Sequence, residues 1–374
     1  MDITPFFQLM VDRGASDLFF TVGAPPNIKI EGKLSPVGQN AITSQQISEI
    51  AASIMSDEHR KEFEATMELN MAISILGCGR FRVNMFRQRG EIAIVIRYIK
   101  DEIPKIEDLG LPLVLQQIVM ELRGLVLVVG ATSSGKSTTL ASMIDYRNEH
   151  HRGHILTIED PIEYLHNHKR SIVDQREVGM DTKSYESALV NAMREAPDVI
   201  LIGEIRNRET MKHAIAYAET GHLCLSTLHA NNANQTLDRV INFFPEEAKQ
   251  QLLLDLSLNL KAIISLRLIP GLKSKRVPAV EILINSPYIA DLIEKGKVEE
   301  IKEVMARNRE QGMQTFDQAL FDLYKEGKIS KENAIRYADS KNNVGLQIRL
   351  TEEGKSVHDV DADLTIEDDD LNKF

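Results

Sequence analysis

A glycine-rich loop between an apolar run and a helix-forming segment constrains this chain more than any other feature. Residues 125–129 read Leu-Val-Leu-Val-Val, and residues 130–137 read Gly-Ala-Thr-Ser-Ser-Gly-Lys-Ser, which fits Gly-x-x-x-x-Gly-Lys-Ser at every required position. A short apolar run that ends in glycine predicts a buried parallel strand, and residues 138–146 can continue as a helix. Because this order of elements is what confirms a phosphate-binding loop, a chance match in a turn is the weaker interpretation.

The residue types in this loop explain how it would hold phosphate. Backbone N–H groups turn inward to form a nest for anions, and Gly135 allows a phosphate to approach closely. Lys136 would reach the β- and γ-phosphates of a nucleotide, and the Ser137 hydroxyl would hold Mg²⁺. The residues predicted to bind the nucleotide are Gly130, Ala131, Thr132, Ser133, Ser134, Gly135, Lys136, Ser137 and Thr138. The loop alone fits kinases, GTPases and motor proteins alike.

Length and composition indicate a globular chain with more than one domain. The 374 residues allow two or three domains, because single cores rarely grow past about 250 to 300 residues. The apolar content of 43% and the charged content of 26% are ordinary. No apolar run approaches the ~20 residues that cross a bilayer, and the N-terminus lacks a basic segment followed by an apolar one, so we expect a cytoplasmic protein. Cys78 and Cys224 lie far apart in no metal-like spacing, which indicates buried reduced thiols.

The net charge of −11 is unevenly distributed along the sequence. Residues 351–374 hold nine acidic and two basic side chains, a net −7 that leaves −4 for the rest. We expect this acidic tail to be solvated and disordered, and a partner-binding role is the alternative. The near-neutral balance elsewhere argues against a nucleic-acid translocase, which would show a basic groove, so no nucleic-acid partner is expected.

The order of predicted elements indicates an α/β protein with two domains. Residues 1–100 alternate short helices and strands, which predicts a small α+β domain, and residues 101–111 form a linker. Residues 112–350 alternate apolar strands with helices, which indicates a parallel sheet covered by helices and followed by a C-terminal helical part.

The expected strands are 17–22, 27–31, 71–76, 80–87 and 91–99 in the first domain, and 125–129, 154–158, 199–202, 223–227 and 279–284 in the second. The expected helices include 44–55 and 57–65, one that Pro112 opens and that ends near Arg123, and short pieces from Ser286 to about Ala338.

The expected strand 80–87 has two distinct faces, because side chains alternate along a strand. Phe81, Val83 and Met85 fall on one face, and Arg80, Arg82 and Asn84 fall on the other. In the next strand the isoleucines at 92, 94 and 96 share a face, and Arg97 falls on the opposite one. This arginine face is either a solvated surface or a face that meets phosphate at a subunit boundary.

Acidic and histidine residues after other predicted strands help to distinguish among the classes of protein that have a phosphate loop. Glu204 follows one strand, where it can hold Mg²⁺ through water or polarise an attacking water, and capping of the next helix is the alternative. Glu159, Asp160 and Glu163 follow another strand, and such a cluster suits metal binding or general-base work, although each can be an ordinary surface acid. His229 would emerge at the same edge of the sheet, although a lone histidine is usually structural.

Together these motifs resemble the secretion ATPases that drive type IV pili and type II secretion, and within them the PilT-like retraction branch. The phosphate loop, the acidic box at 157–164 (Thr-Ile-Glu-Asp-Pro-Ile-Glu-Tyr), the strand end Gly203-Glu204 and the histidine box at 221–229 occur in the family's order and approximate spacing. Residues 15–18 (Ala-Ser-Asp-Leu) and 79–84 (Gly-Arg-Phe-Arg-Val-Asn) match the N-terminal domain of that branch. The resemblance covers about the first 350 residues.

The resemblance implies a PAS-like N-terminal domain followed by a RecA-like P-loop domain, assembled into a homo-hexamer that binds ATP and Mg²⁺. Glu163 would be the water-activating base, Glu204 the Walker B acid, and His229 a sensor of the γ-phosphate. Arg82 and Arg97 of a neighbouring subunit would act as fingers on the transferred phosphoryl group. Ser137 and Glu204 would hold Mg²⁺, the latter through water.

Departures from the family pattern indicate which member of the retraction branch this sequence resembles. The chain has no four-cysteine zinc module and starts directly at the PAS-like part, unlike the extension and type II motors. The stretch 288–296 (Tyr-Ile-Ala-Asp-Leu-Ile-Glu-Lys-Gly) replaces the Ala-Ile-Arg pattern of the usual retraction motor, and Phe19, Ser133 and Asn207 are atypical. With the acidic tail, these features look most like a companion of PilT, the principal retraction ATPase.

The leading hypothesis is a Mg²⁺-dependent ATPase that supports type IV pilus retraction, and hence twitching motility, together with PilT. Its other expected partner is the platform protein of the pilus machine, at the cytoplasmic face of the inner membrane. A nucleotide-binding adaptor ring that boosts PilT without hydrolysis of its own is the alternative. Another P-loop enzyme, such as a nucleotide kinase or a DNA translocase, is disfavoured by the charge balance and the motif set.

Overall fold

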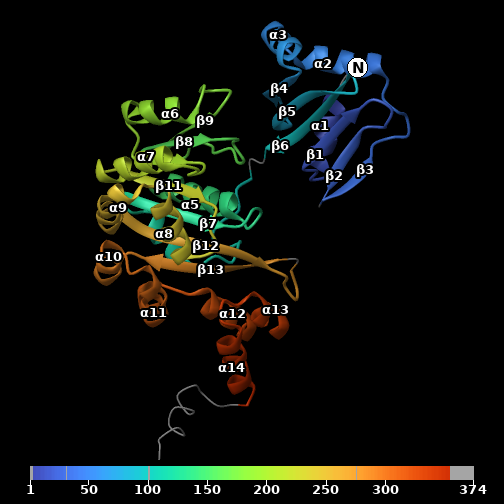
Figure 1. The fold of residues 1–374 in the computed structure, drawn as a ribbon. Coiled ribbons are helices and arrows are strands. Elements are labelled where there is room, and N and C mark those ends of the chain that lie inside the picture. The colour runs from blue at the N-terminus through green and yellow to red at the C-terminus, as the bar shows by residue number, and fades with distance from the viewer. Residues whose placement is uncertain (1–2, 31, 100–101, 275, 354–374) are drawn as a thin grey trace, which may run out of the picture. The chain divides into compact units, whose positions relative to one another are not determined.

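The computed structural model describes residues 3–30, 32–99, 102–274 and 276–353 (Figure 1). The chain divides into two compact units. The first contains the chain up to Ile103 together with Thr157–His168 and Val173–Ala188. The second contains Pro104–Leu156, Lys169–Ile172 and the chain from Leu189 onward.

The N-terminal sheet has six strands in the order β3-β2-β1-β6-β5-β4, and each neighbouring pair is antiparallel. The strands are β1 (Asp17–Thr21), β2 (Asn27–Ile30), β3 (Lys33–Pro36), β4 (Glu68–Ile75), β5 (Gly79–Gln88) and β6 (Glu91–Ile99). The helices are α1 (Thr4–Asp12), α2 (Ser44–Ile54) and α3 (Asp57–Thr66). Thr43 and Gln46 start α2 with a reciprocal capping box.

The two faces of β5 behave as the alternation predicts. Phe81, Val83 and Met85 are fully buried and join one apolar core with α1 and α2, whereas Arg80, Arg82 and Asn84 stay partly exposed. The ring of Phe81 lies 4.5 Å from the ring of Phe7 in α1. One face of the sheet is therefore committed to packing, and the arginines lie on the other.

The second sheet has seven strands in the order β13-β12-β7-β11-β10-β8-β9. The strands are β7 (Gly124–Gly130), β8 (His154–Glu159), β9 (Ile172–Glu177), β10 (Val199–Ile202), β11 (Leu223–Leu228), β12 (Leu260–Ile269) and β13 (Val277–Ile284). Strand β7 is parallel to both β11 and β12, β10 is parallel to β11, and β13 is antiparallel to β12. All seven residues of β7 are buried, as expected for a central strand covered on both faces.

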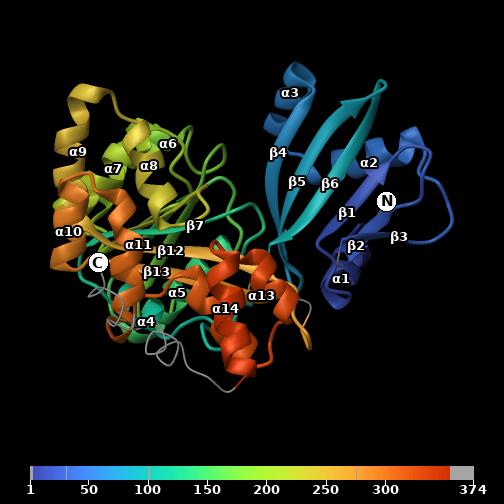
Figure 2. The ribbon, with the colours of Figure 1, turned by 60° about the horizontal axis from the view of Figure 1, so that its bottom comes forward.

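The helices of this part of the chain are α4 (Val114–Val119), α5 (Lys136–His150), α6 (Tyr185–Ala192), α7 (Arg208–Glu219), α8 (Ala233–Asn242), α9 (Glu246–Asn259), α10 (Pro287–Glu294), α11 (Ile301–Arg307), α12 (Phe316–Lys325), α13 (Lys331–Tyr337) and α14 (Lys341–Glu352). Helices α12 to α14 pack around a separate small core that includes Phe316, Leu320 and Ile348. Figure 2 shows α13 and α14 side by side at the red end of the ribbon.

The predicted strands and the two predicted helices of the N-terminal part are confirmed, with end points that move by a few residues. Strands β3, β9 and β12 were not predicted. The four residues of β3 are all exposed and lack an apolar alternation, and β12 follows α9 with no glycine or proline to separate two apolar segments. The predicted helical pieces end at about Ala338, whereas the structure has a further helix, α14, that extends to Glu352.

The helix expected from Pro112 to about Arg123 is wrong in length, since α4 covers only Val114–Val119. Nη1 of the buried Arg147 donates hydrogen bonds to the carbonyl oxygens of Val119 at 2.6 Å and Glu121 at 2.8 Å. A side chain from α5 thus satisfies carbonyls at the end of α4, and the chain turns into β7.

Three further expectations concern composition. Cys78 and Cys224 are both unpaired and buried, as expected. Among the described residues, no helix is long and apolar enough to cross a membrane. The acidic tail predicted at 351–374 lies outside the described residues from position 354 onward.

A buried carboxylate lies in β13, next to the small C-terminal core. The Glu281 side chain accepts hydrogen bonds from the backbone N–H of Ala233 at 2.8 Å and from the Ser265 hydroxyl at 3.3 Å, and the residue is only 2% exposed. Burial raises the pKa of this carboxyl to about 7, although the Ala233 N–H bond acts in the opposite direction. The folded chain therefore holds a proton here over a pH range in which the unfolded chain has released it.

Glu281→Gln is expected to stabilise the protein more at high pH than at low pH. Between the ordinary carboxyl pKa of 4.5 and the folded value of about 7, the folded state binds more protons, so wild-type stability falls as pH rises and stays lower above that range. The amide has no proton to lose, yet its oxygen still accepts from Ala233. Thermal unfolding at about pH 5 and about pH 8 should show a larger stability difference in favour of the variant at the higher pH. An equal difference at both pH values would contradict the raised pKa, and Glu246→Gln, an exposed site, is the control.

Candidate active site

The predicted phosphate loop joins the end of β7 to the start of α5. Its backbone passes through the left-handed region at Ser133 and Gly135. At Gly130 a Cβ atom would lie 2.4 Å from Ser134 Oγ and 2.7 Å from the carbonyl oxygen of Leu266. Only glycine fits this position, because the loop and the neighbouring strand β12 approach too closely for a side chain.

The loop offers donors suited to a phosphate chain. Lys136 is buried, and its Nζ donates to the carbonyl oxygens of Gly130 at 2.9 Å and Ala131 at 3.0 Å, which holds the ammonium group at the loop. Gly135 is the N-cap residue of helix α5, and no side chain caps the first N–H groups of the helix. Ser134 Oγ is buried without a hydrogen-bond partner among the described residues. A buried polar atom, an uncapped helix N-terminus and a lysine at one loop fit a bound polyphosphate.

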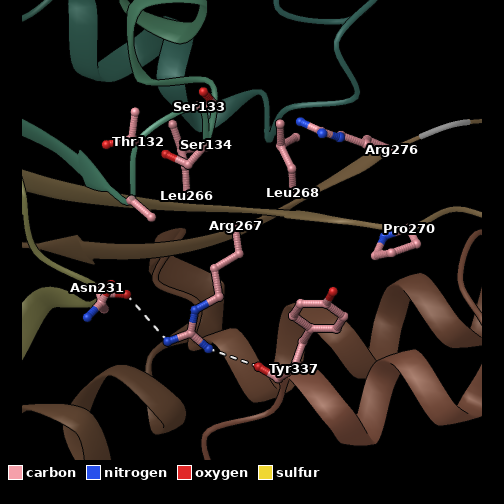
Figure 3. Close-up of a pocket in the computed structure, with 11 residues that line it drawn as sticks. Thr132, Ser133, Ser134, Asn231, Leu266, Arg267, Leu268, Pro270, Arg276 and Tyr337 are labelled. Carbon is pink, nitrogen blue, oxygen red and sulfur yellow. Dashed lines mark hydrogen bonds between the residues drawn. The ribbon is translucent and has the colours of Figure 1, made fainter. Parts of the chain in front are cut away.

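A pocket of about 480 Å³ lies beside the loop (Figure 3). Its wall combines the loop with the ends of β12 and β13 and with α13. The lining residues include Ser134, Asn231, Arg267 and Tyr337. Figure 3 shows the Arg267 side chain between Asn231 and Tyr337.

Glu204 and His229 come together in the second unit. Nε2 of His229 lies 3.1 Å from Oε1 of Glu204, and Nε of Arg206 donates to Oε2 of the same carboxylate at 2.7 Å. The carboxylate is thus shared between two basic side chains, and its own side chain is 21% exposed. Arg206 was not among the predicted site residues, although its place two residues after Glu204 was a signal.

The backbone after β10 and β11 explains why these residues meet. The two strands are parallel, with Ile202 opposite Ser226. The Thr227 hydroxyl donates to the Gly203 carbonyl oxygen at 2.6 Å, and the Ile205 N–H donates to the Thr227 carbonyl oxygen at 2.9 Å. The carboxyl ends of neighbouring parallel strands lie at one edge of a sheet, which is where ligands bind in such folds.

The acidic box lies in the first unit, and its glutamates have different environments. The Glu159 carboxylate accepts from the Thr157 hydroxyl at 2.7 Å and from Gln175 Nε2 at 3.3 Å. Desolvation raises the pKa of Glu159 to about 7, with a further contribution from the charge of Glu163, and these hydrogen bonds act against the rise. The Glu163 side chain is exposed, while its backbone N–H bonds to the Glu159 carboxylate. Glu159 therefore holds the segment from which Glu163 projects.

The two predicted finger arginines also lie in the first unit, directly opposite each other on β5 and β6. Arg97 faces Asp17 of β1 on its other side, and its Nε donates to Asp17 Oδ1 at 2.8 Å. Asp17 is buried, whereas the Arg97 side chain is 66% exposed. The ion pair orients Arg97 on the polar face. Within the parts of the chain that the structure describes, Arg82 beside it forms no ion pair with a carboxylate.

This chain is similar to known proteins over nearly its whole length. Residues 2–341 match the family model described as type II/IV secretion system protein. The chain is 52% identical to the type IV pilus ATPase PilU of Pseudomonas aeruginosa, over 96% of this chain and 94% of that protein. It is 42% identical to the type IV pilus retraction ATPase PilT of the same organism, over 92% of this chain and 100% of that protein.

A crystal structure of the pilus retraction motor PilT with bound ADP is similar to the whole fold. It shares 42% identity, has a TM-score of 0.85, and covers 91% of this chain and 98% of that one. The fold is thus an N-terminal domain followed by a RecA-like ATPase domain. The chain belongs to the type II/IV secretion system protein family. Within that family it belongs to the PilT-like branch, and it is more similar to PilU than to PilT of P. aeruginosa.

Proposed function

We propose that this protein is a Mg²⁺-dependent, ATP-hydrolysing motor that supports type IV pilus retraction, and so twitching motility, together with PilT. The observation that carries the proposal is the contact of 3.1 Å between His229 and Glu204 in a chain that also has an intact phosphate loop. The similarity to PilU and PilT over nearly the whole chain supports the choice of pilus among the processes that such ATPases drive.

Each site residue has a distinct role in this proposal. Lys136 and the backbone N–H groups of the loop bind the β- and γ-phosphates of ATP. Glu163 takes a proton from the attacking water, and His229, oriented by Glu204, contacts the γ-phosphate. Arg82 and Arg97 of a neighbouring subunit neutralise charge on the transferred phosphoryl group.

The Ser137 hydroxyl and the Glu204 carboxylate are the residues that would hold Mg²⁺. Both present oxygen atoms, which Mg²⁺ prefers, and both are half-buried. Because Arg206 and His229 already occupy the Glu204 oxygens, that carboxylate would act on the ion through water. When bound, the ion neutralises phosphate charge.

Glu204→Gln is expected to raise the Mg²⁺ concentration for half-maximal ATP hydrolysis by about tenfold, because the amide removes a negative charge near the ion. A magnesium titration of steady-state hydrolysis measures this value. Glu209→Gln is a matched control, since Glu209 lies nearby in sequence on the exposed side of α7. An unchanged magnesium requirement in the Glu204 variant would remove this residue from the metal site.

The proposed assembly is a homo-hexamer in which each PAS-like N-terminal domain (residues 1–100) packs on the ATPase domain (residues 112–350) of the next subunit. The linker between the two domains is 101–111. Rings of identical subunits allow a site to take residues from two copies. The ring would work in the cytoplasm, at the face of the inner membrane where PilT and the pilus platform protein act.

Pilus retraction in cells tests the function directly. The gene is replaced by one encoding Lys136→Ala, and retraction is compared with that of the wild type and of the gene deletion. A motor predicts that the point variant resembles the deletion. If the protein is an adaptor ring, the point variant should retract pili at the wild-type level. In a separate assay of the purified protein, acceleration of ATP hydrolysis by DNA or by a small phosphate acceptor would point instead to another P-loop enzyme.

A further inference from the structure

Arg267 lies on β12, directly beside the phosphate loop. In the parallel register of β12 and β7, Leu266 is opposite Gly130, so Arg267 comes one residue after the strand partner of the first loop glycine. Its side chain is 22% exposed and is one of the residues that line the pocket. Figure 3 shows it extending from β12 toward Asn231 and Tyr337. None of the proposed catalytic steps uses this guanidinium group.

On one side, Arg267 holds the segment that follows the histidine box. Nη2 of Arg267 donates to the carbonyl oxygen of Asn231 at 3.4 Å. Asn231 is two residues after His229 and directly precedes Asn232, whose side chain caps α8. Only two peptide units therefore separate His229 from the carbonyl group that Arg267 contacts.

On the other side, Arg267 holds the connection between α13 and α14. Its Nη1 donates to the carbonyl oxygen of Tyr337 at 3.0 Å and lies 2.7 Å from Oδ1 of Asp339. Asp339 also pairs with Lys302 at 2.8 Å. The guanidinium carbon lies 3.7 Å from the ring centre of Phe316, which belongs to the core of α12 to α14.

We infer that Arg267 is a positioning residue that couples the His229–Asn231 segment to helices α13 and α14. The inference rests on the proposed function, since it requires nucleotide at the loop. A planar guanidinium group donates in several fixed directions at once, which a lysine ammonium on a flexible stem does not reproduce. The Asn231 contact is the longest of the set, so it is the one that a shift of the histidine segment changes first. The C-terminal helices then report the state of the nucleotide.

Hydrogen exchange with the full-length chain tests this coupling. Exchange is measured with and without a non-hydrolysable ATP analogue and Mg²⁺, in the wild type and in Arg267→Lys. In the wild type, nucleotide is expected to change exchange in the phosphate loop, in residues 229–233 and in residues 337–345. In Arg267→Lys the first two responses remain and the third is lost. The variant's kcat falls by about fivefold while its KM for ATP stays within about twofold.

Lys302→Met separates coupling from simple support of the C-terminal core. This variant removes the other partner of Asp339 but leaves every contact of Arg267 with the histidine segment. It is expected to keep the nucleotide response at 337–345 and the wild-type kcat. The inference is wrong if Lys302→Met also loses the nucleotide response at 337–345 and the wild-type kcat. It is equally wrong if Arg267→Lys keeps the nucleotide response at 337–345. A wild type that responds in the phosphate loop but not at 337–345 overturns the inference alone, whereas no response in the loop overturns the proposed function with it.

Discussion

Lys136→Ala is expected to reduce ATP hydrolysis by about a thousandfold, to the background of the assay. The ammonium group is buried at the loop, where Gly130 and Ala131 hold it, and alanine removes this cation from the β- and γ-phosphates. Charge that develops on the phosphates in the transition state then loses the positive group that the loop supplies. Steady-state release of inorganic phosphate by the purified chain measures the effect.

Two comparisons make the Lys136 result decisive. Lys212→Ala removes an exposed lysine of α7 that pairs with Glu209 of the same helix, and it should leave hydrolysis unchanged. Thermal unfolding of both variants shows whether the fold is intact. Hydrolysis at the wild-type rate in a folded Lys136→Ala protein would mean that the phosphate loop is not the catalytic site.

Glu163→Gln is expected to lower kcat by a factor on the order of 10² to 10⁴, as for loss of a general base. Glu159→Gln should cost at most about tenfold, because the amide oxygen still accepts the N–H bond that holds the Glu163 segment. The two residues share one box, so the pair of variants assigns their roles. Single-turnover hydrolysis at saturating ATP measures the chemical step.

Nucleotide affinity supplies the control for this pair. Neither variant changes the phosphate loop, so binding of a fluorescent ATP analogue should stay within about threefold of the wild type. A loss of kcat in Glu159→Gln that exceeds the loss in Glu163→Gln would transfer the base to Glu159, whose raised pKa of about 7 suits proton transfer near neutral pH.

The phosphate loop and its strand could be predicted because they depend on neighbouring residues. The spacing of Gly130, Gly135 and Lys136 sets the turn, and five successive apolar residues have no stable place except a buried strand. Glu204 and His229 were each expected at the catalytic edge because each follows a predicted parallel strand. The structure brings the two side chains within 3.1 Å of each other, and their catalytic roles remain a prediction.

The parts that could not be predicted depend on contacts between distant residues. Arg267 meets Asn231 across 36 positions and Tyr337 across 70. Strand β12, which carries Arg267, is difficult to recognise in the sequence. Apolar residues run from α9 into β12, and no glycine or proline separates the helical period from the strand period. The pairing of Arg97 with Asp17 likewise joins residues 80 positions apart, and only the sheet register brings them together.

Native mass measurement combined with an activity assay tests most directly the central claim that this chain hydrolyses ATP as a ring. The purified protein is examined with and without ATP and Mg²⁺ over a range of concentrations, and phosphate release is recorded on the same samples. We expect assemblies of six copies of the 42.1 kDa chain, with activity per chain that rises as they form. A chain that remains a monomer and hydrolyses ATP at a constant rate per molecule would contradict it, because no neighbouring subunit could then supply Arg82 or Arg97.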